Sequence, residues 1–181
     1  GFITAWPTGQ TQPGTANLSS TTGTVTASAA IVPAGTSGSI NVYASNTTDL
    51  IIDVNGYFAP AGTGGLSLYS LTPCRVLDTR NSNGGQPFSG ELDENVPSSA
   101  CGVPGGAQAY VLNATVVPPA SLGYLTLWPQ GTTQPLVATL SALDATVTSN
   151  LAIVPTTNGS ISTFASNPTQ LILDIFGFFA P

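Results

Sequence analysis

Charged side chains are scarce in this chain: Asp, Glu, Lys and Arg make up only 6% of 181 residues, and Lys, His and Met are absent. The two basic residues are Arg75 and Arg80, and the net charge is −6. No basic patch is available to neutralise a row of phosphates, so nucleic acid is excluded as an expected partner. Without His or Lys to act as a base, we predict no catalytic residue, no cofactor and no metal, and therefore a protein that is not an enzyme.

Long apolar runs are also missing. No stretch reaches the roughly 18 apolar residues that a membrane span needs, and nothing at Gly1 resembles a secretion signal, so we expect no membrane insertion and a signal that was removed or lies upstream. Ser and Thr make up about a quarter of the chain and give it an uncharged polar surface. Such a surface is typical of a secreted protein, in the extracellular space or at a cell surface, or of a packed assembly.

Cysteine occurs twice, at Cys74 and Cys101. An even number without a C-x-x-C motif favours a structural disulfide over a metal or redox site. The alternative is two buried free thiols. Closing a loop of about 27 residues would stabilise the fold by roughly 3 to 4 kcal/mol.

What the chain does contain is a repeat. Residues 1–60 align with residues 123–181 after deletion of one residue near Ser37, and about half of the positions are identical, which gives a period of about 121 residues. The sequence therefore predicts one complete unit at residues 66–181, preceded by the C-terminal half of another at residues 1–60. The segment AGTGG at residues 61–65 has the composition of a linker. We call residues 66–122 the leading half, residues 123–181 the trailing half, and residues 1–60 the N-terminal copy.

The strand pattern predicts an all-β fold. Short segments rich in Thr, Val, Ile and aromatic residues are bounded by Gly, Pro or Asn, and no helical period is present. We expect about five strands in residues 1–60, including residues 22–33 and 48–58, and eight or nine in the complete unit. This density indicates tandem β-sandwich units, jelly-roll or Greek-key-like. Residues 81–106 are expected to form a long polar loop, either binding a ligand or held by the disulfide.

Opposite charges cluster in one place, at Arg75, Asp78 and Arg80. In an extended segment Asp78 and Arg80 share a face, and Arg75 points the other way. Asp53 and Asp174 lie within apolar runs, where a buried carboxylate needs a partner. We predict a buried structural ion pair between Arg75 or Arg80 and Asp174.

Three acids, Glu91, Asp93 and Glu94, fall in the expected loop. Clustered oxygen ligands could hold Ca²⁺, but the spacing of a calcium loop is missing, which favours a solvated acidic loop. Trp6 and Trp128 occupy equivalent positions in the two copies. Core packing is the favoured interpretation, and stacking on a sugar ring is the alternative.

The motifs PCRVLDTR (residues 73–80), CGVPGG (101–106), GYLTLWPQG (123–131) and LILDIFGFF (171–179) resemble a repeat unit of secreted bacterial multidomain and surface proteins. The resemblance covers residues 66–181 and, for its second half, residues 1–60. It implies an extracellular location and no particular chemistry. Phe176 and Phe178 depart from the N-terminal copy, which has Asn55 and Tyr57 there.

Half a repeat cannot close its own core, so residues 1–60 need strands from upstream in a longer chain or from another molecule. We therefore expect copies to join head to tail, as a homopolymer that forms an extracellular filament or surface stalk. The more apolar end of the second copy predicts that Phe176, Phe178 and Phe179 lie at a contact between units. The alternative function is a carbohydrate-binding or adhesive module that recognises surface glycans through Trp6, Trp128 and the long loop.

Overall fold

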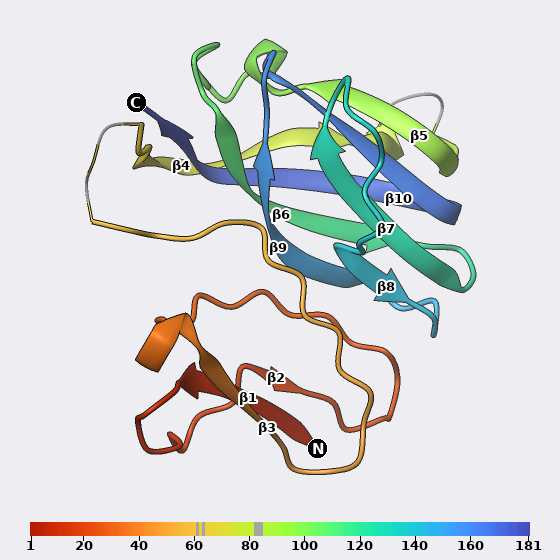
Figure 1. Ribbon diagram of the computed structural model, residues 1–181. Helices are drawn as coiled ribbons and strands as arrows, with labels where there is room; N and C mark the ends of the chain where they lie inside the picture. Colours follow the sequence, from red (N-terminus) through yellow and green to blue (C-terminus); the bar gives the residue numbers. More distant parts are fainter. Residues whose placement is uncertain (61, 63, 82–84) are drawn as a thin grey trace. The chain divides into compact units, whose positions relative to one another are not determined.

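The computed structural model describes residues 1–60, 62, 64–81 and 85–181, and these residues form an all-β protein (Figure 1). The chain divides into two compact units, Gly1–Ile52 and Asp53–Pro181. This division falls before the linker expected at residues 61–65, of which residues 61 and 63 lie outside the described part. The predicted all-β, sandwich-like class is confirmed.

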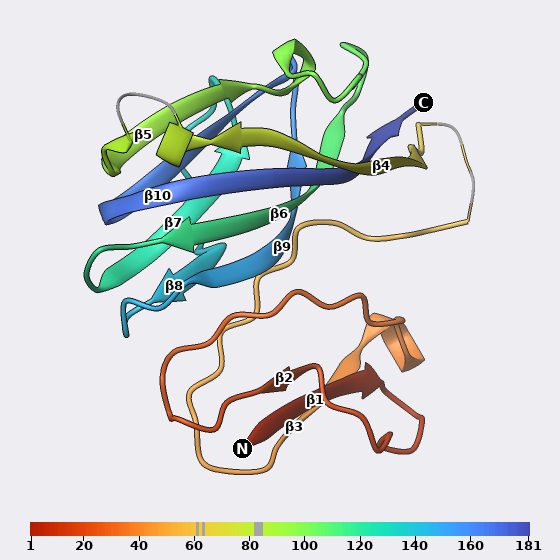
Figure 2. The same cartoon turned by 180° about the vertical axis from the view of Figure 1, so that it is seen from behind.

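The C-terminal unit is built around one long strand, β10. Its strands in the described residues are β4 (Ser67–Asp78), β5 (Phe88–Asn95), β6 (Ala109–Val117), β7 (Leu122–Pro129), β8 (Leu140–Ala142), β9 (Thr148–Pro155) and β10 (Ser160–Ala180). The first part of β10 pairs with β5 and β7, and its second part pairs with β4 and β6. Strand β9 continues the sheet beyond β6, and β8 continues it beyond β7, all antiparallel. Figure 2 shows β4, β10, β6 and β9 side by side.

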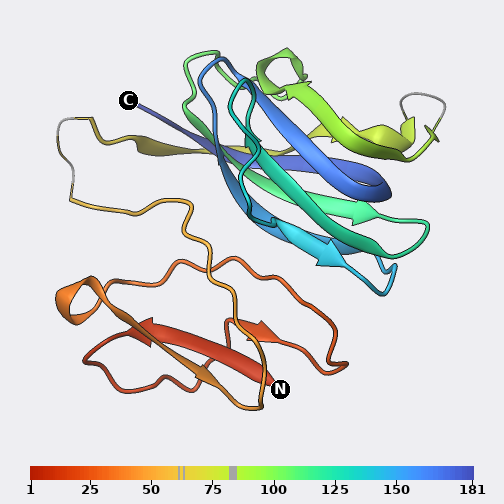
Figure 3. The ribbon, with the colours of Figure 1, turned by 45° about the vertical axis from the view of Figure 1, so that its right-hand side comes forward.

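A bend in β10 allows one strand to serve both sheets. The register with β5 shifts between Ala165 and Thr169, and Pro168, which has no N–H to donate, lies in this interval. Figure 3 shows the blue ribbon folding back at this bend. The two sheets enclose a core of fully buried side chains that includes Leu112, Leu125, Leu140, Ile161, Leu171, Leu173 and Ile175.

The N-terminal unit has a small sheet in the order β2-β1-β3. Its strands in the described residues are β1 (Phe2–Pro7), β2 (Leu18–Ser19) and β3 (Ile40–Ala44). The 3-10 turn η1 (Thr36–Gly38) precedes β3, and Ser37, which has no counterpart in the second copy, takes a left-handed conformation there with φ 57°. The extra residue is thus accommodated in a turn and leaves the strands in register.

Two expectations about elements are wrong. Residues 22–33 and 48–58 contain no strand, although their composition predicts one. Residues 81–106 are not a single loop, because β5 and the 3-10 turn η4 (Val96–Ser98) lie within them, while residues 82–84 of that range are outside the described part. Strand β5 forms because it pairs with β10, a contact that its own polar sequence does not reveal.

Candidate assembly interface

The two copies of the repeat fold alike wherever their partners lie within the copied sequence. Strands β1, β2 and β3 correspond to β7, β8 and the start of β10, and four local hydrogen bonds are equivalent. These bonds join Thr4 to Thr15, Trp6 to Gln10, Ala5 to Asn17 and Phe2 to Ser45 in the N-terminal copy, and Thr126 to Val137, Trp128 to Thr132, Leu127 to Thr139 and Tyr124 to Ser166 in the trailing half. The sequence repeat is therefore also a repeat of backbone structure.

The copies differ in the two segments that lack a strand in the N-terminal copy. Residues 26–33 correspond to β9, and residues 49–58 correspond to the second part of β10. In the C-terminal unit these elements pair with β6, and β10 pairs also with β4. Strands β4 and β6 belong to the leading half, which the N-terminal copy does not contain. A segment thus becomes a strand only where the leading half is present.

Leu50, Ile52 and Val54, which would form one face of a strand here, are left exposed, and we call them the open face. Leu50, Ile52 and Val54 are 47%, 55% and 82% exposed, whereas their counterparts Leu171, Leu173 and Ile175 are completely buried. Exposed apolar surface costs about 25 cal/mol for each Å², so three such side chains within five residues make this segment a candidate for a contact. These three residues were not predicted from the sequence as a contact. The signal was present, because apolar residues alternate at 50, 52 and 54 in a copy that includes no leading half.

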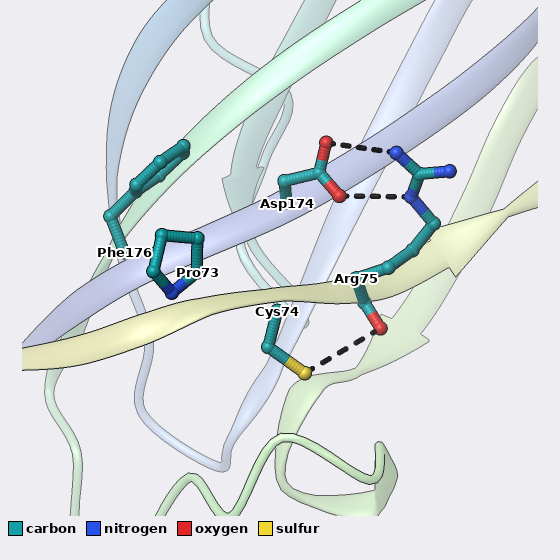
Figure 4. A pocket seen from close by; sticks show the side chains of 5 residues that line it. All are labelled: Pro73, Cys74, Arg75, Asp174 and Phe176. Carbon is teal, nitrogen blue, oxygen red and sulfur yellow. Dashed lines mark hydrogen bonds and ion pairs between the residues drawn. The ribbon is translucent and has the colours of Figure 1, made fainter.

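The charge cluster lies at the β4–β10 pairing, where an open pocket is lined by Pro73, Cys74, Arg75, Asp174 and Phe176 (Figure 4). The Arg75 guanidinium donates from Nε to Asp174 Oδ1 at 2.9 Å and from Nη2 to Oδ2 at 3.3 Å. The predicted pair is present, but it is not buried. The side chain of Arg75 is 49% exposed and that of Asp174 24%, so the pair contributes little to stability.

Asp78 is the buried member of the cluster, with a side chain that is 7% exposed. It accepts hydrogen bonds from Arg80 at 2.6 Å and from Arg75 at 3.3 Å, and the bonds from Arg80 lower its pKa most. The expectation that Arg75 points away from Asp78 is wrong. The register between β10 and β4 shifts at Leu173 and Asp174, and this irregularity breaks the alternation of β4 between the two residues.

The disulfide between Cys74 and Cys101 is confirmed, with Cα atoms 5.6 Å apart. It ties β4 to the turn that follows η4. The alternative of two free thiols is excluded.

The three phenylalanines of the expected contact differ in their surroundings. Phe178 stacks on Tyr69 at 5.2 Å between ring centroids, and Phe179 lies 6.0 Å from Phe58. Both are half-buried, whereas Phe176 is exposed beside the pocket. The role of all three in a contact between units stays a prediction, with Phe176 as the accessible member.

The tryptophans do not form a matched sugar platform. Trp128 is only 3% exposed, and its indole N–H donates to the carbonyl of Thr132 at 3.1 Å, so it cannot stack on a sugar ring. Trp6 is half-buried and makes the same bond to Gln10 at 3.0 Å. The turn after each strand folds back over the indole edge, which explains why the ring belongs to the packing.

The acids expected in a loop lie on strand β5 instead. Glu91 and Asp93 share one face of the strand and Glu94 the other. Asp93 accepts hydrogen bonds from Ser162 at 2.6 Å and from Gln130 at 2.7 Å, and these bonds, that from Ser162 first, lower its pKa. Burial raises the pKa of Glu94. Within the described ranges, no group of three His, Cys, Asp or Glu side chains is placed to hold a metal ion.

The bonds to Asp93 predict a dependence of stability on pH. A lowered pKa in the folded state means that the ionised carboxylate adds stability above its unfolded pKa of about 3.9, and that this stability is lost as the pH falls through the folded value. We expect Asp93→Asn to reduce the loss of melting temperature on acidification below about pH 4. Glu91→Gln removes one charge from the same strand and is the control. An equal effect of both variants would assign the dependence to net charge.

Comparisons with protein-family models, curated proteins and solved structures give no match. Among the residues that the structure describes, no helix has the length and apolar character to cross a membrane.

Proposed function

We propose that this chain is a non-enzymatic, secreted structural protein whose β-repeats join end to end into an extracellular filament or surface stalk. The observation that carries the proposal is the open apolar face at Leu50, Ile52 and Val54, in a copy of the repeat whose counterpart is closed. The equivalent residues of the C-terminal unit are covered by β4 and β6 of the same repeat. A leading half supplied upstream or by another molecule would cover the open face in the same way and continue the series of repeats.

The repeat itself supports a linear arrangement. The N-terminal copy is a trailing half alone, and the C-terminal unit holds a complete repeat, so the two offer different surfaces. Contacts between different surfaces continue in one direction and produce extended objects when they do not close into a ring. Phe176, exposed on the complete repeat, is the side chain expected at the opposite contact.

The covalent and surface chemistry support an extracellular setting. Disulfides persist in oxidising environments, and the Cys74–Cys101 bridge ties together the leading half of the repeat. The surface is polar through Ser, Thr and Asn more than through charge, since charged residues are only 6% of the chain.

Immuno-electron microscopy of the native material tests the function. Antibodies against residues 66–181 are expected to label filaments or stalks outside the cell, at regular intervals along their length. Labelling of dispersed single molecules or of the cell interior would contradict the proposal. Specific binding of glycans by such dispersed molecules would support the adhesive module instead.

A further inference from the structure

We infer that the N-terminal copy is a docking site for the leading half of a repeat, a disulfide-bonded polypeptide segment with the strand pattern of residues 66–122. This inference rests on the proposed tandem-repeat function and adds the partner that covers the open face. The C-terminal unit supplies the template, because it shows the same trailing half with its leading half in place.

One strand of the leading half accounts for both segments that form no strand in the N-terminal copy. Strand β6 lies between β10 and β9 and pairs with both. The equivalent strand of a docked leading half would lie between residues 50–58 and residues 26–33 and convert both into strands. No other single strand of the C-terminal unit contacts both counterparts through backbone pairing in the described residues.

The side chains of β6 specify what the open face accepts. Tyr110, Leu112, Ala114 and Val116 alternate along the strand and are completely buried. In register, Val116 lies opposite Leu171, and Ala114 lies opposite Leu173. By the same register, the apolar side chains of the docked strand would cover Leu50 and Ile52.

A glycine marks the place of the β4-type strand. At Gly177 an added Cβ would lie 2.6 Å from the carbonyl oxygen of Tyr69 in β4, so the neighbouring strand passes too close for any side chain. The N-terminal copy also has glycine there, Gly56, although an added Cβ would meet no described atom within 4 Å. Nothing in the open copy requires glycine at residue 56, whereas a docked β4-type strand does.

The charge of Asp53 also favours a β4-type strand as its neighbour. Asp174 binds Arg75 of β4, and its counterpart Asp53 is exposed. A leading half of the PCRVLDTR type would bring an arginine to Asp53 in the same geometry. Shape at Gly56 and charge at Asp53 therefore select the same partner strand.

The leading half at residues 66–122 is already paired with residues 123–181. The leading half that docks on the N-terminal copy is therefore a further one, carried upstream in the same polypeptide or by another molecule.

The test is to attach a copy of residues 66–122 directly before Gly1, which reproduces the junction between residues 122 and 123, and to measure hydrogen exchange with mass spectrometry. Docking is expected to slow the amide exchange of residues 26–33 and 50–58 by at least about 100-fold relative to the original chain. The added segment should also form its own disulfide. Unchanged exchange in an extended chain whose added disulfide has formed would overturn the inference.

Gly56→Val is the matched control. In the original chain the new side chain meets open space and should leave unfolding unchanged, whereas in the extended chain it should abolish the protection of residues 50–58. Equal protection of residues 50–58 in the extended chain with and without this substitution would also overturn the inference. The outcome is independent of whether filaments are found in the native material.

Discussion

Leu173→Ala is expected to lower the free energy of unfolding of the C-terminal unit by about 2 to 5 kcal/mol, because it leaves a cavity at a completely buried position of β10. The equivalent substitution in the N-terminal copy, Ile52→Ala, is expected to change stability by less than about 0.5 kcal/mol, since Ile52 is exposed. The same position of the repeat thus contributes strongly to stability in the C-terminal unit and little in the N-terminal copy.

Denaturant unfolding can follow each unit separately, because the two Trp residues, Trp6 and Trp128, lie one in each unit. Trp6→Phe leaves Trp128 as the reporter of the C-terminal unit, and Trp128→Phe leaves Trp6 for the N-terminal unit. Similar losses from Leu173→Ala and Ile52→Ala would mean that the N-terminal copy is closed.

Replacing both cysteines by alanine is the second large change. Cys74 and Cys101 are separated by 27 residues, and loss of this loop constraint is expected to cost about 3 to 4 kcal/mol in the C-terminal unit. The effect arises mainly from greater freedom of the unfolded chain, so the folded strands β4 and β10 should remain paired.

Unfolding of the double variant, monitored through Trp128, measures this loss. The N-terminal unit, monitored through Trp6, is the internal control and should unfold as before. A loss below about 1 kcal/mol in the C-terminal unit would show that the bridge does not constrain the unfolded state as the loop model requires.

The class of fold and the disulfide were predictable from the sequence, because both depend on local signals. The two-residue period in segments such as residues 2–7 and the pairing of two isolated cysteines are visible without tertiary information. Strand β5 was not predictable, since acids and Gly90 interrupt its pattern and its existence depends on β10.

In the N-terminal copy the sequence predicted strands that do not form. Residues 26–33 and 49–58 have the composition of strands but form none, whereas their counterparts in β9 and β10 are strands. Strand propensity describes how well side chains suit a paired, half-buried surface, so it predicts a strand only when the partner is present. The ion pair was predictable in its residues but not in its exposure, because the shift in register at Asp174 is a tertiary feature.

Hydrogen exchange of the chain in dilute solution tests the central claim most directly. Residues 50–58 and 171–179 are equivalent in the repeat, and we predict fast exchange in the first and slow exchange in the second, because only the second lies between β4 and β6. Equal protection of the two segments would show that the N-terminal copy already has its partners, and would contradict the open half-repeat on which the proposed assembly depends.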